Sequence, residues 1–308
     1  NRPKPGLRPQ HLHSIQTIAE LSNSTTEGLD LNSTRVSLHP NNISSKNIDI
    51  NIGTAGSITL LVQSLLQSIS ISGKKFTFTI TGGTDVNWSP SADYLCRIVI
   101  PMLEKFGFSI NSSVIKRGFY PKGSGKIIFK VKSPTKIKPI SIIEPEYSNL
   151  VIDGIITSGS SISKSQSKID EQCLYAKIFL EQHQLNIDSI NTSTHDSGSF
   201  SSGICISSTS QNCFIGSDIL ETNIKQLNSL GKNCSKKFLS EYSSNCTVDH
   251  HLADIIIPFL SLSKSSSQST TSYVSSHLQT NLDLCKSITG MNYKINKKTK
   301  FCYLVSIN

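Results

Sequence analysis

Apolar residues recur at helical spacing in six stretches of the chain, at 11–21, 58–69, 92–106, 170–181, 218–239 and 251–262. A spacing of three to four residues is typical of helices that bury one face. Six shorter runs have the alternation or apolar content of strands, at 48–52, 75–80, 126–132, 150–156, 203–208 and 301–307. Because the two kinds of element alternate along the chain, the pattern predicts an α/β protein.

The first half of the chain repeats a helix-then-strand unit. Ser-rich stretches at 157–167 and 261–272 indicate a domain boundary and a loop. We therefore expect one larger domain, made of residues 1–159 and 244–308, and a smaller inserted α/β domain at 160–243.

Charge is unevenly distributed over the 308 residues, whose formal net charge is +9. Nine cations and no acid lie between Lys105 and Ile143. A basic field of this kind favours polyanions, of which nucleic acid is the commonest for a soluble protein. A membrane surface fits less well, since no apolar run approaches ~20 residues and no amphipathic basic helix stands out.

The eight cysteines are scattered, with no C-x-x-C pair and no histidine at zinc-ligand spacing. This usage indicates free thiols in a reducing compartment, and we expect a cytoplasmic protein.

Residues 1–11 place three cations and three prolines in a stretch without acids. Prolines restrict the backbone, so Arg2, Lys4 and Arg8 could be presented to a phosphate at reduced conformational cost. A solvated basic loop is the alternative interpretation.

Two glycine-rich segments flank the second predicted helix. Residues 53–57 (G-T-A-G-S) begin it, where free backbone N–H groups suit a phosphate, although a plain N-cap explains them as well. Residues 82–85 (G-G-T-D) form either a turn capped by its Asp or a nucleotide-lining loop with Pro90 against a base.

Residues 116–125 join cations, two aromatics and a glycine-rich turn, a combination that suits single-stranded nucleic acid. The strand that follows places Lys126, Lys130 and Lys132 on one face and apolar residues on the other. A hairpin with a solvated lysine face remains an equal alternative.

Asp254 and His277 are the titratable residues of greatest chemical interest. Asp254 lies in a predicted helix whose apolar neighbours point inward, and His277 lies between a strand and a helix. A lone histidine at such a junction is usually structural. Neutral imidazole can also attack an activated phosphorus and form a covalent intermediate.

Six motifs in register resemble the RNA 3′-terminal phosphate cyclase family over nearly the whole chain: N-R-P-K-P-G-L-R-P-Q-H, G-T-A-G-S-I-T-L, G-G-T-D, R-G-F-Y-P-K-G-S-G, H-L-A-D and S-H-L-Q-T-N. The resemblance implies ATP and a divalent metal, Mg²⁺ or Mn²⁺, as cofactors. It implies a covalent histidine–AMP, transfer of AMP to the 3′-phosphate of an RNA, and closure by the 2′-hydroxyl to a 2′,3′-cyclic end. The implied fold is a large domain of repeated units, each pairing helices with a four-stranded sheet, plus a small inserted α/β domain.

Carried over residue by residue, the resemblance implies that His277 is the adenylated nucleophile. Asp254 would orient that imidazole or assist the metal site, and His251 would stand where a family tyrosine often packs near the nucleotide. Arg2 and Gln10 would hold phosphates, and Gln63 and Pro90 would lie along the nucleotide. No residue is assigned to the metal, and no oligomeric state is predicted.

Three departures from the family pattern matter. We expect the family's amino-terminal segment, with its G-G-G-Q-type motif, to lie upstream of Asn1. Ser124 stands where glycine is usual, and the loop before His277 is Ser-rich. One alternative is a non-catalytic branch of the family that acts in ribosome assembly; it lacks the nucleophilic histidine, so the presence of His277, Arg2 and Gln10 argues against it. A generic RNA-binding module is the other.

Overall fold

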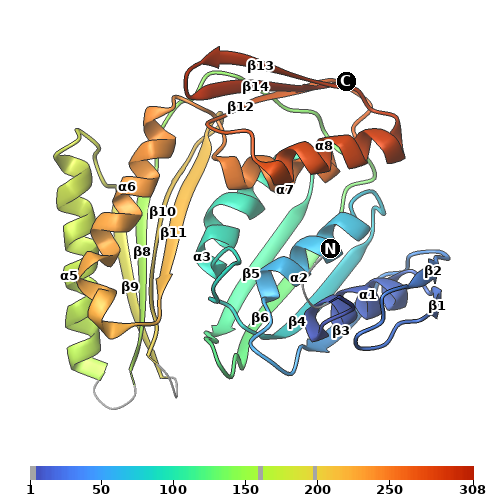
Figure 1. The fold of residues 1–308 in the computed structure, drawn as a ribbon, viewed down its shortest axis with the longest axis horizontal. Helices are drawn as coiled ribbons and strands as arrows, with labels where there is room; N and C mark the ends of the chain where they lie inside the picture. The colour runs from blue at the N-terminus through green and yellow to red at the C-terminus, as the bar shows by residue number, and fades with distance from the viewer. Residues whose placement is uncertain (1–4, 159–161, 197–199) are drawn as a thin grey trace. The chain divides into compact units, whose positions relative to one another are not determined.

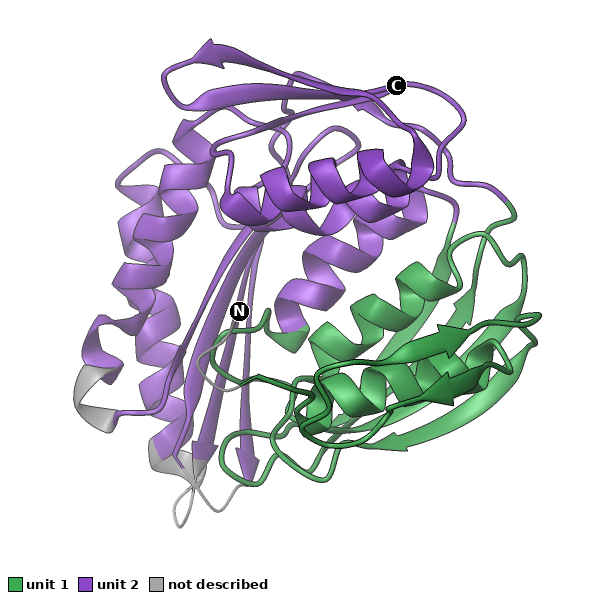
Figure 2. Ribbon diagram, turned by 45° about the vertical axis from the view of Figure 1, so that its right-hand side comes forward, with its two compact units in different colours: residues 1–92, 108–135 green, residues 93–107, 136–308 purple. Residues whose placement is uncertain are grey.

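Mixed β-sheets with helices on one face make up the part of the chain that the computed structural model describes, residues 5–158, 162–196 and 200–308 (Figure 1). This confirms the α/β prediction. Two compact units are distinguished: unit 1, residues 1–92 and 108–135, and unit 2, residues 93–107 and 136–308 (Figure 2).

Unit 1 is built on the four-stranded sheet β3-β4-β6-β5. Its strands β3 (Lys46–Asn51) and β4 (Lys75–Gly82) are parallel, whereas β6 (Gly125–Lys132) is antiparallel to β4 and to β5 (Ser109–Lys116). The helices are α1 (Pro9–Leu21) and α2 (Ile58–Ser68), and a hairpin of β1 (Thr25–Glu27) and β2 (Ser37–His39) follows α1.

Alternation along β6 follows the prediction from sequence. Ile127, Phe129 and Val131 are buried in the core of unit 1. The intervening lysines, Lys126, Lys130 and Lys132, are exposed on the opposite face of the sheet. Hydrophobic burial therefore sets the register of this strand, because a slip of one residue would bury the lysines.

The predicted helix at 92–106 forms in three pieces, α3 (Ala92–Tyr94), the π-helical turn η1 (Leu95–Val99) and α4 (Ile100–Lys105). The π-helical turn ends two residues before Pro101, which has no backbone N–H to donate.

Unit 2 contains the sheet β11-β10-β8-β9. Its elements in chain order are β8 (Leu150–Ser158), α5 (Ile162–Glu181), β9 (Ser189–Asp196), β10 (Ser202–Thr209), β11 (Phe214–Glu221), the 3₁₀ turn η2 (Ile224–Ser229) and α6 (Leu230–Ser243). Helices α5 and α6 lie side by side on one face of the sheet (Figure 1), over a core that includes Ile152, Ile169 and Phe238. The inserted domain at 160–243 stays a prediction; β8, which precedes that boundary, pairs with β9 and β10.

The predicted helix at 218–239 was wrong at its start. Residues up to Glu221 belong to β11, which pairs with β10 along its whole length. The helix begins only at Leu230. The apolar residues of 214–221 do not recur at a clear helical spacing. These residues form a strand because their backbone hydrogen-bonds to β10.

The second sheet of unit 2, β13-β14-β12-β7, repeats the pattern of the sheet in unit 1. It contains β7 (Ser141–Ile142), β12 (Ser267–Thr271), β13 (Tyr293–Thr299) and β14 (Cys302–Ile307), with α7 (His250–Leu260) and α8 (Ser276–Thr289) as its helices. In both sheets the first two strands are parallel and the last two form an antiparallel hairpin. This common strand order confirms the repeated unit of helices and a four-stranded sheet.

All eight cysteines are free thiols, as predicted. No helix among the described ranges combines the length and apolar character that a membrane span needs.

Candidate functional site

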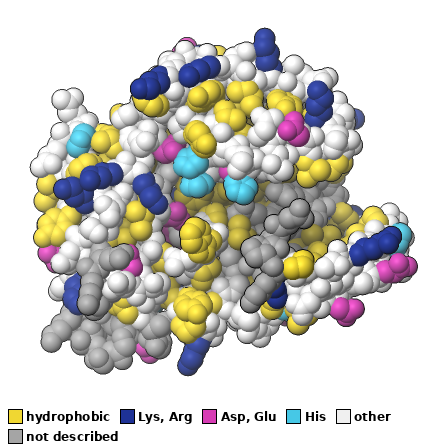
Figure 3. Space-filling model, viewed as in Figure 1, with side chains coloured by type: hydrophobic (Ala, Val, Ile, Leu, Met, Phe, Trp, Pro, Cys, Tyr) yellow, Lys and Arg dark blue, Asp and Glu magenta, His cyan; other side chains and the backbone are white. Residues whose placement is uncertain are grey.

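The amino-terminal ends of α7 and α8 carry the residues that the sequence singled out in unit 2: His251 and Asp254 lie in the first two turns of α7, and His277 lies in the first turn of α8. Helix α7 begins at the cap Asp249, and helix α8 begins at the cap Ser275. His250 and His251 lie in the first turn of α7, and His277 lies in the first turn of α8. Histidine side chains gather on one face in Figure 3. Helix N-termini expose backbone N–H groups and a positive dipole end, so this arrangement suits anionic ligands.

Asp249 fixes the start of α7 from inside the protein. Its carboxylate accepts hydrogen bonds from the backbone N–H groups of His251 and Leu252, at 3.0 and 2.9 Å, and from Gly216 of β11 at 2.9 Å. The hydroxyl of Tyr94 donates to the same carboxylate, at 2.7 and 2.9 Å from its two oxygens. The side chain has no solvent exposure. This carboxylate ties α7 to β11 and to α3.

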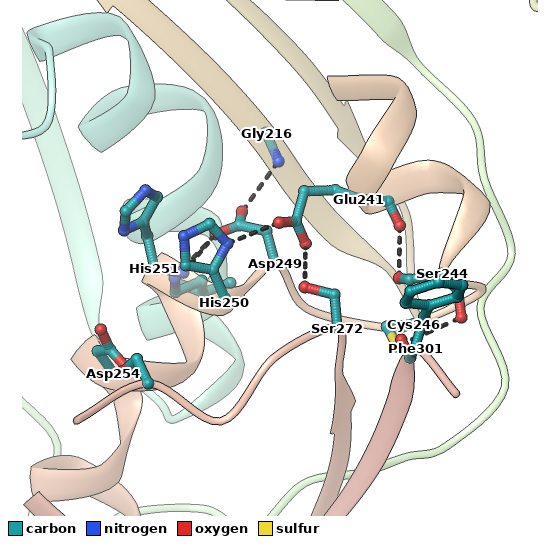
Figure 4. A network of polar contacts seen from close by, with 12 residues as sticks. Gly216, Glu241, Ser244, Cys246, Asp249, His250, His251, Asp254, Ser272 and Phe301 are labelled. Carbon is teal, nitrogen blue, oxygen red and sulfur yellow. Dashed lines mark hydrogen bonds and ion pairs between the residues drawn. The ribbon is translucent and has the colours of Figure 1, made fainter. Parts of the chain in front are cut away.

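His250 is held by a carboxylate from α6. Its Nδ1 lies 2.6 Å from Oε1 of Glu241, and the other carboxylate oxygen accepts a 2.7 Å hydrogen bond from the hydroxyl of Ser272. Figure 4 shows His250 between Glu241 and His251. The bond to Glu241 raises the pKa of His250 above its usual value, although partial burial opposes that rise.

His251 has the opposite electrostatic character. Its ring centroid lies 3.9 Å from that of His250, with the ring planes tilted by 40°. Two effects lower the pKa of His251 to about 4. The larger is partial loss of hydration, and the second is repulsion from the nearby positive charge of His250. The side chain still contacts solvent, so His251 presents a neutral aromatic ring at the surface at pH 7.

Asp254 contacts the cap of α8 directly. Its Oδ1 accepts a 2.5 Å hydrogen bond from the hydroxyl of Ser275, and its backbone carbonyl accepts a 2.8 Å bond from the side chain of Asn281. The Ser275 hydroxyl in turn accepts from the N–H of Leu278 at 2.9 Å. Burial raises the pKa of Asp254, while the bond from Ser275 and the charge of His277 oppose this rise. Asp254 therefore positions the helix end that carries His277.

The imidazole of His277 is exposed in the first turn of α8. Helices α7 and α8 pack against each other, and the hydrogen bond from Ser275 to Asp254 joins them two residues before His277. Among the residues that the structure describes, none makes a hydrogen bond to its ring. The structure thus brings His277, Asp254 and His251 together within unit 2.

Three further predicted residues lie around α2 in unit 1. The side-chain oxygen of Gln10 accepts a 3.3 Å hydrogen bond from the N–H of Ser57, the cap of α2. The carbonyl of Pro90 accepts a 2.7 Å bond from the hydroxyl of Thr59. Gln63 lies one turn further along α2; its side chain is buried, and its Nε2 has no hydrogen-bond partner among the described residues. Arg2 lies outside the described residues.

The glycine-rich segments of unit 1 pack against one another. A side chain at Gly123, whose φ is +70°, would lie 2.8 Å from the carbonyl oxygen of Thr54. Ser124, where the family usually has glycine, adopts φ of +61°, a left-handed conformation that glycine adopts with least strain. Ser124 therefore adopts a backbone conformation in which glycine would be less strained.

Arg117 and Phe119 have structural roles in unit 1. Arg117 pairs with the buried carboxylate of Asp85 at 3.2 Å, and Asp85 also accepts from the hydroxyl of Thr84 at 2.6 Å. Phe119 is buried, whereas Tyr120 is exposed. Lys122, Lys126 and Lys130 are exposed and stay predicted RNA contacts.

The sequence did not single out Glu241, Asp249, His250 or Ser275. An Asp or Ser immediately before a helical run is a recognisable N-cap, so two of these residues carried a usable signal. Glu241 carried none, because only the tertiary fold brings it to His250. Among the described residues, no group of three or more His, Cys, Asp or Glu side chains has an arrangement that could hold a metal ion.

The histidine pair has a testable titration behaviour. We expect ring resonances in nuclear magnetic resonance spectra to give His250 a pKa above 6.5 and His251 a pKa near 4. Because the folded-state pKa of His250 is raised, its pair with Glu241 adds stability below about pH 6.5, which is lost as pH rises through the folded pKa. Glu241→Gln should return the pKa of His250 toward the ordinary value. A His250 pKa that does not respond to Glu241→Gln would contradict the assignment.

Comparison with known proteins gives a consistent result. A sequence model of the family described as RNA 3′-terminal phosphate cyclase matches residues 1–295. A protein of that name from Pyrococcus abyssi is 33% identical over 297 residues, which cover 96% of this chain and 84% of the relative. Proteins of the same name from Archaeoglobus fulgidus and Methanosarcina barkeri are 32% and 33% identical, over 94% and 97% of this chain and 85% and 86% of their own lengths.

Proposed function

The chain belongs to the RNA 3′-terminal phosphate cyclase family, and we propose that it is a ligase-class enzyme that converts an RNA 3′-terminal phosphate into a 2′,3′-cyclic phosphodiester. ATP is a substrate of the proposed reaction and is consumed to AMP and pyrophosphate. The observation that carries the proposal is the position of His277, an exposed imidazole in the first turn of α8, two residues after the cap Ser275 that binds Asp254 of α7.

His277 is the proposed nucleophile. A ring nitrogen uses its lone pair to form a bond to the α-phosphorus of ATP, and the bond from that phosphorus to the pyrophosphate oxygen breaks. An oxygen of the RNA 3′-phosphate then displaces His277 from the phosphorus. Finally the vicinal 2′-hydroxyl oxygen attacks the activated terminal phosphorus, losing its proton, and AMP leaves. The 2′-hydroxyl requirement explains why the substrate is RNA.

The start of α8 supplies charge stabilisation beside this nitrogen. Leu278 N–H is occupied by the Ser275 cap, so the N–H groups of Ser276 and His277 are the first-turn donors that remain for phosphate oxygens. Asp254 holds the Ser275 hydroxyl and thereby the helix start. In-line displacement at phosphorus depends mainly on positioning and charge stabilisation, and in this proposal the start of α8 supplies both.

His251 offers a flat, neutral surface for the adenine base. With its pKa lowered to about 4, the imidazole carries no charge at neutral pH, and its ring already packs at a tilt against that of His250. This is the type of ring on which a base stacks.

Mg²⁺ or Mn²⁺ is proposed only as the companion of the triphosphate, whose oxygens are the usual ligands of such an ion. No residue of the chain is assigned to it, and no step above depends on it.

Gln63 supports the binding of a polar ligand in unit 1. An amide N–H₂ group buried without a partner costs roughly 1–3 kcal/mol, and an acceptor atom of the nucleotide would remove that cost. Gln10 and Pro90 are further proposed nucleotide contacts of unit 1, and Arg2 is a proposed phosphate contact.

We expect Gln63→Leu to separate nucleotide binding from stability. The variant should be at least as stable as the wild type, because it removes a buried donor that lacks a partner. It should need a higher ATP concentration for half-maximal adenylation. Adduct yield against ATP concentration, together with urea unfolding, tests both parts; lower stability with unchanged ATP dependence would show that Gln63 is only a core residue.

The test of the proposed function is cyclisation of a 3′-phosphorylated RNA by the full-length protein. With ATP and Mg²⁺ or Mn²⁺, the labelled 3′-phosphate should become resistant to phosphatase, and a 2′-deoxy end should stay sensitive. RNA binding without ATP-dependent cyclisation would favour the non-catalytic alternative.

A further inference from the structure

The hairpin of β13 and β14 ends in a basic and aromatic tip, formed by Lys297, Lys298, Lys300 and Phe301. The whole segment 284–308 contains five lysines and no acid. Lys297, Lys298 and Lys300 are exposed, and the Phe301 ring is 59% exposed. Figure 3 shows Lys and Arg side chains over the sheet that carries this hairpin, at the top of the view.

The tip pairs each aromatic ring with a cation. The Nζ of Lys300 lies 5.1 Å from the centroid of Phe301, and the Nζ of Lys297 lies 5.8 Å from that of Tyr303. An exposed ring beside an ammonium group can stack a base while the cation contacts the adjoining phosphate. Single-stranded nucleic acid presents both groups in alternation.

The fold brings this tip to the end of the sheet where His277 lies. Strand β13 runs back along α8 in the opposite direction (Figure 1), and Tyr293 at its start donates to Asp283 of that helix. At the other end, Tyr303 of β14 is paired in register with Thr271 of β12. Thr271 is six residues before His277, so their Cα atoms are at most about 21 Å apart.

Two more contacts connect the tip with the α7 end of the site. The carbonyl of Phe301 accepts a hydrogen bond from the thiol of Cys246 at 3.7 Å, three residues before the cap Asp249, and Figure 4 places Phe301 in the same close view as His250. Tyr273 lies between Thr271 and the Ser275 cap, is 59% exposed and packs edge-on to His250, with ring centroids 6.4 Å apart. An exposed aromatic therefore lies on the path from His277 to the tip.

We propose that the tip of the β13–β14 hairpin binds the RNA strand that leads to the reacting 3′-end, with a base stacked on Phe301 and phosphates held by Lys297, Lys298 and Lys300. This inference rests on the proposed function for the identity of its ligand. The reacting end lies at His277, and the strand passes Tyr273 before it reaches the tip.

The test compares the triple variant Lys297→Ala, Lys298→Ala, Lys300→Ala with a matched triple variant, Lys168→Ala, Lys232→Ala, Lys236→Ala, which removes three exposed lysines from α5 and α6. The probe is a labelled single-stranded oligouridylate with a 3′-phosphate, and binding is measured without ATP over a range of salt concentrations. The tip variant should bind at least about 10-fold more weakly, with a salt slope smaller by about 2, since each single-strand phosphate contact contributes about 0.7. The matched variant should keep the wild-type slope.

Phe301 gives a second, independent measurement. Phe301→Ala should weaken binding about 5-fold or more, and Phe301→Trp should restore it, because any large ring can stack a base.

Equal affinity and equal salt slope in the tip and matched variants would overturn the inference, whether or not the wild type cyclises RNA. If the wild type binds RNA through the tip but forms no cyclic end, the proposed function fails and this binding surface stands.

Discussion

His277→Ala and His277→Asn are expected to form no adenylated protein and to cyclise 3′-phosphorylated RNA at least about 10³-fold more slowly than the wild type. A methyl group has no lone pair, and an amide nitrogen has its lone pair delocalised into the carbonyl. Both variants should fold, because the imidazole is exposed and receives no hydrogen bond from the described part of the chain. Adduct yield with labelled ATP and the rate of RNA cyclisation measure the effect.

His183→Ala is the matched control for this loss. His183 is also exposed, two residues after the end of α5, and its ring contacts the carbonyl and the ring of Phe179. This variant should keep wild-type adduct yield and cyclisation. Normal adduct formation by His277→Ala would show that another residue carries the AMP.

Asp249→Ala is expected to lower the free energy of unfolding by about 3–7 kcal/mol. It removes the cap of α7, worth about 1 kcal/mol, and the carboxylate that accepts from the buried Tyr94 hydroxyl and from the Gly216 N–H, at roughly 1–3 kcal/mol for each lost bond. Urea unfolding with an unchanged slope m measures this loss.

Two further variants separate the parts of that loss. Tyr94→Phe measures one hydrogen bond to the carboxylate, and Asp30→Ala is the control for removing a carboxylate at the surface. Tyr94→Phe removes one donor but leaves three others on the carboxylate, so its cost should be about 1 kcal/mol. Asp30→Ala removes an exposed carboxylate and should stay within about 0.5 kcal/mol of the wild type. If Asp249→Ala cost no more than Tyr94→Phe, the carboxylate would not be the link between α7, β11 and α3.

Periodicity predicted the amphipathic elements well, because burial of one face determines their conformation. Helix α2 and strand β6 are examples, each with buried apolar residues at the expected spacing. Strand β9 was missed, since its sequence S-I-N-T-S-T-H-D is mostly polar and its strand conformation comes from parallel pairing with β8. The edge strand β13 was also missed: its sequence Y-K-I-N-K-K-T is mostly polar, and its strand conformation comes from antiparallel pairing with β14.

The residues of the candidate site were also predictable only where a local sequence motif identifies them. The motifs around His251, Asp254 and His277 are local in sequence, and the helix starts that carry them do lie together in unit 2. The contact of Glu241 with His250 depends on the packing of α6 against β10 and β11, which no local pattern encodes. The direct partner of Asp254 is also a result of tertiary structure: the carboxylate binds the Ser275 cap.

The measurement that tests the central claim most directly is the location of the AMP on the protein. Full-length protein is incubated with labelled ATP and a divalent metal, digested at neutral to mildly alkaline pH, and its peptides are sequenced by mass spectrometry. We predict one acid-labile adenylyl group, on the imidazole of His277. An adenylyl group on a different residue, or none on a protein that still cyclises RNA with ATP, would contradict the account.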